Sequence, residues 1–195
     1  DLLRSGLPDV QASAARLLEM FVADPGVRHR LASTDAPSLL VPLLSFGGRL
    51  QVHVLGTLLP LAAEQPGRRA LLDAGVAPSL VGLLENAEST AVRQPALSLL
   101  LLLLSDVELA EQAAQQLAQG GALRFCTALL GSADANARKL ALVLLRQLSQ
   151  HEASRCELGR PELVERLCAL LTRDDSALQP QQSQQRALAE EREHV

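Results

Sequence analysis

The chain has 195 residues, a hydrophobic content of 48% and a formal net charge of −4. A chain of this length can bury roughly 70% of the surface that its unfolded form exposes, so it is able to fold alone. Because Asp and Glu outnumber Lys and Arg by 22 to 18, there is no basic field to attract a phosphate backbone, and we expect no nucleic acid partner. The longest largely apolar run, residues 96–104, is about half of the roughly 20 residues that span a membrane, so no membrane partner is expected either.

The composition indicates both the type of secondary structure and the cellular compartment. The apolar residues are mostly Leu, Ala and Val, with three Phe and neither Tyr nor Trp, which predicts an all-α chain. Cys126, Cys156 and Cys168 have no metal-binding spacing, and we interpret them as buried thiols. No N-glycosylation acceptor occurs, so the cytoplasm is the expected location, with the nucleus as the alternative. Since the sequence begins at Asp1 and a helical pattern starts almost at once, we expect a segment of a longer protein.

In chain order, the apolar periodicity predicts helices in groups of three. Long helices are predicted at residues 10–23, 50–63, 92–105 and 137–149. Short, charged first helices are predicted at residues 27–32, 68–74, 109–118 and 153–158. Second helices lie between them and end in apolar pairs, whose last residues Leu44, Leu84, Leu130 and Leu171 are 40, 46 and 41 residues apart. A period near 42 residues predicts a helical solenoid.

Glycine and proline mark the predicted helix boundaries. Gly75 and Gly120 are expected to end first helices as C-terminal caps. Pro42 and Pro60 fall inside helices, where a missing N–H and a steric clash predict kinks, whereas Pro95 is expected in a first turn, where it costs nothing. Three further prolines open second helices: Pro37, Pro78 and Pro161.

This register divides the chain into a repeat domain, residues 1–173, and a polar tail, residues 174–195. The domain is expected to begin with the third helix of one repeat at residues 9–23. The repeats that follow are expected at about residues 27–63, 67–105, 106–150 and 152–173. The tail is rich in Gln and then in Glu and Arg, and its thin apolar face is compatible with a capping helix or with a disordered segment.

The best-defined unit is residues 67–105, which opens with Gly-Arg-Arg-Ala-Leu-Leu-Asp-Ala-Gly-Val-Ala-Pro-Ser-Leu-Val-Gly-Leu-Leu. This pattern of first and second helices resembles the armadillo repeat family, and the likeness covers about residues 9–171. The resemblance implies an all-α, right-handed superhelical solenoid of about four three-helix repeats. It also implies that the third helices line a concave groove in which an extended or helical ligand lies.

In the nuclear import receptors of this family, two groove positions per repeat carry Trp and Asn. The matching Trp-type positions here are Arg16, Gly56, Ser98 and Val143, and the Asn-type positions are Met20, Pro60, Leu102 and Gln147. Without the Trp and Asn side chains, neither a cation–π surface nor a backbone clamp exists, so recognition of nuclear localisation signals is not expected. The side chains that line the groove are predicted to be mostly small and apolar. The alternative is that another part of the full-length protein, or a second copy, covers these residues.

Basic residues recur on two predicted first helices. Arg28 and Arg30 lie one repeat away from Arg68 and Arg69, which would place them on one edge as a basic patch for an acidic partner. The competing interpretation is that these are ordinary solvated charges.

The expected function is a protein-interaction scaffold or adaptor that binds an apolar or amphipathic segment of another protein in the concave groove. Two alternatives stay open: a chaperone cofactor similar to armadillo-type nucleotide exchange factors, and an oligomerisation arm of a cytoskeletal or ciliary assembly, for which self-association would be needed. No enzyme, cofactor or metal site is predicted, because the glycine pairs lie between helices and the four histidines are widely separated.

Overall fold

The computed structural model describes residues 2–86, 89–132 and 135–169, and contains helices but no strand in these ranges. The helices are η1 (Leu2–Arg4), α1 (Pro8–Phe21), α2 (Pro25–Ala32), α3 (Ala36–Leu40), η2 (Val41–Phe46), α4 (Gly48–Leu61), α5 (Gln65–Asp73), α6 (Val76–Asn86), α7 (Thr90–Leu104), α8 (Ala110–Gln119), α9 (Ala122–Leu130), α10 (Ala135–Leu148) and α11 (Glu152–Leu158). Residues 161–169 are helical as well. The predicted all-α fold is confirmed, and the predicted tail, residues 174–195, lies outside the described residues.

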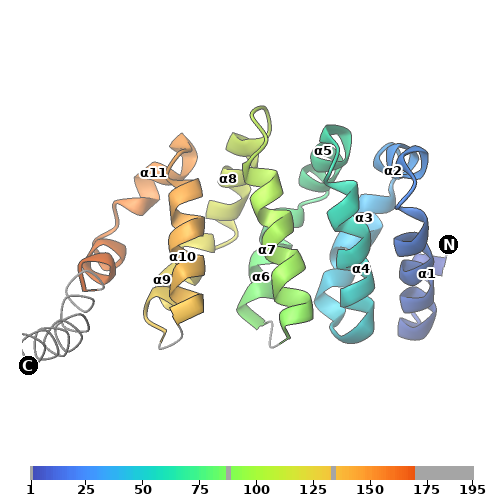
Figure 1. Ribbon diagram of the computed structural model, residues 1–195, viewed down its shortest axis with the longest axis horizontal. Coiled ribbons are helices and arrows are strands. Elements are labelled where there is room, and N and C mark those ends of the chain that lie inside the picture. Colours follow the sequence, from blue (N-terminus) through green and yellow to red (C-terminus); the bar gives the residue numbers. More distant parts are fainter. Residues whose placement is uncertain (1, 87–88, 133–134, 170–195) are drawn as a thin grey trace, which may run out of the picture.

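The helices form a solenoid in which the long third helix of each repeat stands beside that of the preceding repeat (Figure 1). The third helices α1, α4, α7 and α10 lie side by side on one face, and the second helices α3, α6 and α9 lie behind them. The short first helices α2, α5, α8 and α11 line one edge. The predicted three-helix repeats therefore stack along one axis, from the N-terminal end at α1 to α11.

The stacking is not uniform along the axis. α4 packs closely on α1 and on α7, whereas α7 and α10 share a much smaller contact. α10 is held mainly by α9, the second helix of its own repeat. The junction between α7 and α10 is therefore the loosest of those between neighbouring third helices.

The core consists mainly of leucines where successive third helices meet. Leu99 and Leu103 on α7 are fully buried, and burying a Leu side chain contributes roughly 1.5 to 3 kcal/mol. Thr57 has the same place on α4 as Leu99 on α7 and is also fully buried. Its hydroxyl donates to the carbonyl oxygen of His53 at 3.0 Å, so this polar group is satisfied within the helix.

Three of the prolines inside or near helices differ in their effect on the helix that contains them. Pro42 interrupts its helix, since α3 ends at Leu40 and residues 41–46 continue as the 3-10 helix η2. Pro60 does not break α4, which ends one residue later at Leu61. Pro95 was expected in a first turn, but α7 begins at Thr90, so Pro95 lies in the second turn and removes one backbone hydrogen bond.

The two predicted glycine caps differ in their backbone. Gly75 has the left-handed φ of +74° that favours glycine at a helix end. Gly120 has a φ of −73° instead, and Gly121 carries the left-handed conformation with a φ of +87°. Gly120 is required for a different reason, because a Cβ there would lie 2.9 Å from the Cα of Pro78. It allows α8 to approach α6 of the preceding repeat.

Among the residues that the structure describes, none of the helices has the length and apolar character needed to cross a membrane.

Candidate partner-binding groove

The eight predicted groove positions lie on the four third helices, two per helix and four residues apart. Met20 on α1 is 66% exposed, and Leu102 on α7 and Val143 on α10 are 37% and 46% exposed. The side chains of Arg16 and Ser98 are also exposed. Partial exposure is shared by the other three: Gly56, Pro60 and Gln147. These residues are therefore accessible on the described surface, and we take this face as the candidate binding groove.

The groove is not apolar along its whole length, because a polar pair crosses it between α1 and α4. Glu19 reaches from α1 to α4, where its Oε2 lies 2.7 Å from Nδ1 of His53. The same carboxylate covers Gly56, since a Cβ at Gly56 would lie only 2.2 Å from Oε1 of Glu19. The missing side chain at the predicted groove position Gly56 therefore makes room for Glu19.

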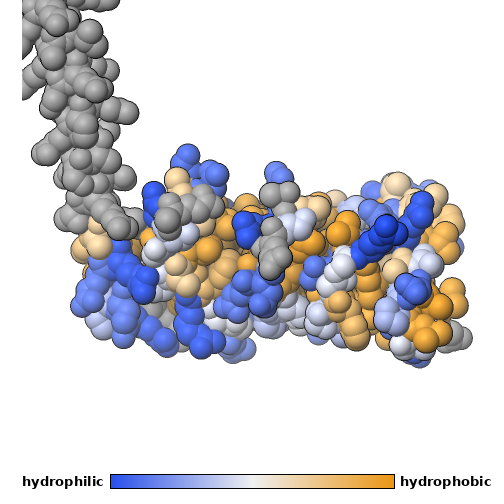
Figure 2. All heavy atoms as spheres, turned by 90° about the horizontal axis from the view of Figure 1, so that it is seen from below, coloured by the Kyte–Doolittle hydropathy of each residue, from blue (hydrophilic) through white to orange (hydrophobic). Residues whose placement is uncertain are grey.

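Exposed apolar side chains gather on either side of this pair. On α1, Leu17 and Phe21 accompany Met20 and are 49% and 58% exposed. On α10, Leu142 accompanies Val143, and both are 46% exposed. Viewed from below, the surface carries more hydrophobic side chains toward the N-terminal end than toward the C-terminal end (Figure 2). The candidate groove therefore has exposed apolar residues on α1 and on α10, with the polar pair of Glu19 and His53 between them.

A cavity of about 540 Å³ lies at the loose junction between α7 and α10. Two of the predicted groove residues, Val143 and Gln147, line it. Val107, in the connection after α7, lines it too and is 99% exposed.

The arginines of the predicted basic patch have another role. Nη1 of Arg28 donates to the carbonyl oxygens of Val22 and Ala23, at 3.1 and 2.9 Å, which follow the end of α1. Nε of Arg28 donates to Oε1 of Glu64, at 2.8 Å, just before α5. One guanidinium thus joins the end of a third helix to the next repeat, and we call this arrangement the arginine clamp.

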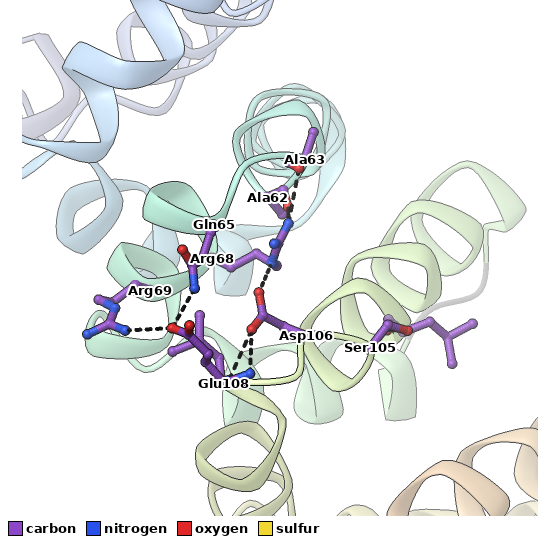
Figure 3. Close-up of polar contacts among 10 residues, drawn as sticks. Ala62, Ala63, Gln65, Arg68, Arg69, Ser105, Asp106 and Glu108 are labelled. Carbon is purple, nitrogen blue, oxygen red and sulfur yellow. Dashed lines mark hydrogen bonds and ion pairs between the residues drawn. The ribbon is translucent and has the colours of Figure 1, made fainter.

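Arg68 forms the same clamp one repeat later (Figure 3). Its Nη1 donates to the carbonyl oxygens of Ala62 and Ala63, at 2.8 and 3.0 Å, and its Nε donates to Oδ2 of Asp106 at 2.6 Å. The side chains of Arg68 and Asp106 are only 18% and 5% exposed. A cation at the C-terminal end of a helix is favoured by the unpaired carbonyls and the helix dipole.

Asp106 is held in its charged form by this contact. Burial alone would raise the pKa of its carboxyl group, but the hydrogen bond from Arg68 opposes this. Backbone N–H groups of Glu108 and Leu109 also donate to Oδ1, at 2.9 and 3.1 Å. Together with the charge of Arg68, these contacts hold the pKa of Asp106 below its ordinary value.

The clamp corrects the predicted basic patch, because Arg28 and Arg68 are used inside the fold. Arg69 is 59% exposed at its side chain and lies 3.7 Å from Glu108, and Arg30 is exposed. Two of the four predicted residues thus keep an accessible cation. The repeated order of an acid followed four residues later by Arg, at positions 24 and 28 and again at 64 and 68, is the sequence signal that could have indicated a structural role.

Metal-ligating residues do not cluster in the part of the chain that the structure describes, where no group of three or more His, Cys, Asp or Glu could hold an ion. Cys126 is buried as expected, and burial raises the pKa of its thiol to about 12. Cys168 is exposed, which corrects the expectation that it is buried.

The comparisons with known proteins agree with this architecture. No protein-family model and no curated protein sequence matches the chain. A computationally designed armadillo repeat protein for modular peptide recognition matches 88% of the chain with 22% identity and a TM-score of 0.68, over 72% of its own length. A designed armadillo repeat protein in complex with the peptide (KR)4 matches 85% of the chain with 23% identity and a TM-score of 0.63, over 67% of its length.

An engineered protein from the Northeast Structural Genomics Consortium matches 92% of the chain with 26% identity and a TM-score of 0.65, over 74% of its length. Other matched structures are longer still: the chain spans 65% of one engineered protein and 39% of another. The solenoid is therefore an armadillo-like repeat fold, as the resemblance of the sequence implied.

Proposed function

We propose that the chain is a peptide-binding repeat scaffold, and that its partner is an apolar or amphipathic segment of another protein lying along α1, α4, α7 and α10. The observation that supports this most directly is the set of exposed apolar side chains on that face, Met20, Leu102 and Val143, on three different third helices. Designed armadillo proteins of the same fold are made for peptide recognition, and one is in complex with a peptide.

The polar pair between α1 and α4 refines the partner. A segment that crosses Glu19 and His53 needs a polar residue there, with apolar residues contacting Met20 on one side and Val143 on the other. Burying each apolar anchor contributes roughly 1.5 to 3 kcal/mol before the cost of ordering the segment is subtracted. We infer that the partner segment is amphipathic along its length rather than uniformly apolar.

Affinity capture with two triple variants tests this proposal. Met20→Glu, Leu102→Glu and Val143→Glu together place charges on the groove. The control variant carries Leu2→Glu, Phe46→Glu and Val164→Glu, which are 60%, 62% and 45% exposed and lie outside the third helices. We expect bound proteins that the control retains and the groove variant loses, with both variants as helical as the wild type by circular dichroism. Identical capture by the groove variant and the wild type would reject the groove.

A second candidate, self-association, is favoured by the N-terminal end of the solenoid. Leu17 and Phe21 are 49% and 58% exposed, although their counterparts on α7, Leu99 and Leu103, are fully buried. Thr57, the counterpart of Leu17 on α4, contacts the preceding third helix through the carbonyl oxygen of Ala15 at 3.4 Å. The face of α1 is therefore built like an interface between repeats, and we infer that a second copy can occupy it. Sedimentation velocity checks this: mass should rise with concentration in the wild type and not in a Phe21→Glu variant.

A further inference from the structure

The arginine clamp recurs in the chain with a fixed spacing. In each case the guanidinium contacts the carbonyl oxygens of the residues six and five positions earlier. Arg155 repeats this after α10, where Nε and Nη2 donate to the carbonyl oxygens of Ser149 and Gln150, each at 3.2 Å. Arg28 and Arg68 follow the same rule after α1 and α4. After three of the third helices, α1, α4 and α10, an arginine of the next first helix thus binds the carbonyl oxygens at the helix end.

The end of α7 lacks this arginine. Ala110 holds the corresponding position on α8, forty-two residues after Arg68 and forty-five before Arg155. The carbonyls that an arginine at position 110 would contact belong to Leu104 and Ser105. Leu104, Ser105 and Ala110 all line the cavity of about 540 Å³ between α7 and α10. The cavity is therefore lined by the residues that correspond to the clamp arginine and to its two carbonyl partners at the other junctions.

At the junction between α7 and α10, a histidine also replaces the acidic partner of the clamp. Glu64 and Asp106 accept from the two complete clamps, and His151 holds the corresponding position after α10. Nδ1 of His151 lies 3.5 Å from Oε2 of Glu111, and its Nε2 is buried without a hydrogen-bond partner among the described residues. Glu111, the residue after Ala110, thus lies beside the histidine that takes the place of the acid, and its own side chain is 57% exposed.

The chemistry of the cavity therefore matches a guanidinium group. The C-terminal end of α7 supplies carbonyl oxygens and the negative end of a helix dipole, and the lining residue His151 lies 3.5 Å from the carboxylate of Glu111. Val107 and Val143 provide apolar walls along which the methylene stem of an arginine can pack. Arg146 also lines the cavity and is the one cation among its lining residues, so it opposes a bound cation.

We propose that the cavity between α7 and α10 is a binding site for an arginine side chain of the partner protein, which completes the clamp that Ala110 leaves open. The site itself is derived from the internal comparison of the clamps. Its link to a partner rests on the proposed function, because Val143 and Gln147 belong both to the cavity and to the candidate groove.

Titration of the full chain with N-acetyl-arginine amide, followed by amide NMR shifts, tests the site without a partner. We expect saturable shifts for residues 104–110 and 151. N-acetyl-citrulline amide has nearly the same shape without the charge, and we expect it to bind about tenfold more weakly because hydrogen bonds to charged groups are the stronger ones. Absence of saturable shifts, or equal binding of both probes, would overturn the proposal.

Three variants sharpen the test. Ala110→Arg fills the site from within, so the probe shifts should disappear, whereas Gln115→Arg adds the same charge at an exposed position of α8 and should leave them unchanged. His151→Glu restores the acid of the complete clamps and should tighten binding of N-acetyl-arginine amide about tenfold. Unchanged binding in Ala110→Arg, with circular dichroism like that of the wild type, would place the probe elsewhere and reject the site.

Affinity capture separates the two proposals. If the probe binds as described but the groove triple variant captures the same proteins as the wild type, the groove function fails and the arginine site stands. If groove capture succeeds but the arginine and citrulline probes bind equally, the arginine site fails alone.

Discussion

Arg68 and Arg69 are neighbours in the sequence, and the fold gives them different environments. Arg68 is nearly buried between the end of α4 and Asp106, with three hydrogen bonds, whereas Arg69 is exposed beside Glu108. Removing one partner of a buried ion pair leaves a charge without compensation, which is costly, while an exposed pair contributes little. The two residues form a matched pair for measuring the clamp.

Arg68→Ala is expected to lower the free energy of unfolding by about 3 kcal/mol, because Asp106 and the carbonyls of Ala62 and Ala63 lose their donor. Arg69→Ala should lower it by less than about 1 kcal/mol. Urea unfolding followed by circular dichroism measures both. Equal losses for the two variants would show that the clamp does not stabilise the solenoid.

Asp106 should make stability depend on pH in the acid range. Its pKa is lower in the folded chain than in the unfolded one, so the unfolded chain binds the proton first as the pH falls. The stabilisation is complete above the ordinary Asp pKa of about 3.9 and is lost as the pH falls through the lower folded value. In urea titrations between pH 5 and 2, Asp106→Asn should make the free energy of unfolding depend less on pH than it does in the wild type. The control Asp73→Asn, at an exposed position, should keep a pH dependence close to that of the wild type.

At the scale of the helix, the sequence predicted the elements well and their lateral contacts poorly. The short first helices were expected at residues 27–32 and 68–74 and are found at Pro25–Ala32 and Gln65–Asp73. Apolar periodicity predicts the start of the third of the long helices at residue 92, but α7 begins at Thr90 because the hydroxyl of Ser89 caps it by accepting from the N–H of Ala91 at 3.2 Å. Periodicity predicts a helix, but a cap depends on local geometry.

The resemblance to armadillo repeats predicts the positions of the groove residues, whereas it does not predict the contacts between helices. Two of the residues at these positions, Met20 and Val143, have exposed side chains. The contact of Glu19 with His53 depends on the sideways offset between α1 and α4, which no repeat alignment specifies. The role of Arg28 and Arg68 depends on helix ends that a list of basic residues leaves out.

Two glycines test how closely the elements approach. A Cβ at Gly67 in α5 would lie 1.8 Å from the carbonyl oxygen of Leu61 at the end of α4, so Gly67→Ala should destabilise the chain by about 2 kcal/mol or more.

Nothing lies within 4 Å of a Cβ at Gly82 in α6, so Gly82→Ala should stabilise the chain by about 0.5 to 1 kcal/mol. Thermal unfolding of the two variants measures this, and a stable Gly67→Ala would contradict the close approach.

At the scale of the whole molecule, the solenoid has one face of third helices and one junction that is looser than the others. Three of the four third helices are joined to the next repeat by an arginine, and α7 is not. The same junction contains the cavity beside Val143 and Gln147. A partner that enters this cavity would therefore bind where the repeats hold each other least.

Hydrogen exchange of the captured partner complex, read by mass spectrometry, tests the central claim most directly. If the face of third helices is the binding groove, exchange should slow in α1, α4, α7 and α10 on binding, and slow most at the ends of α7 and α10 around the cavity. The second helices α3, α6 and α9 should change little. Protection confined to those second helices, or to the edge formed by α2, α5, α8 and α11, would contradict the account and place the partner on another surface.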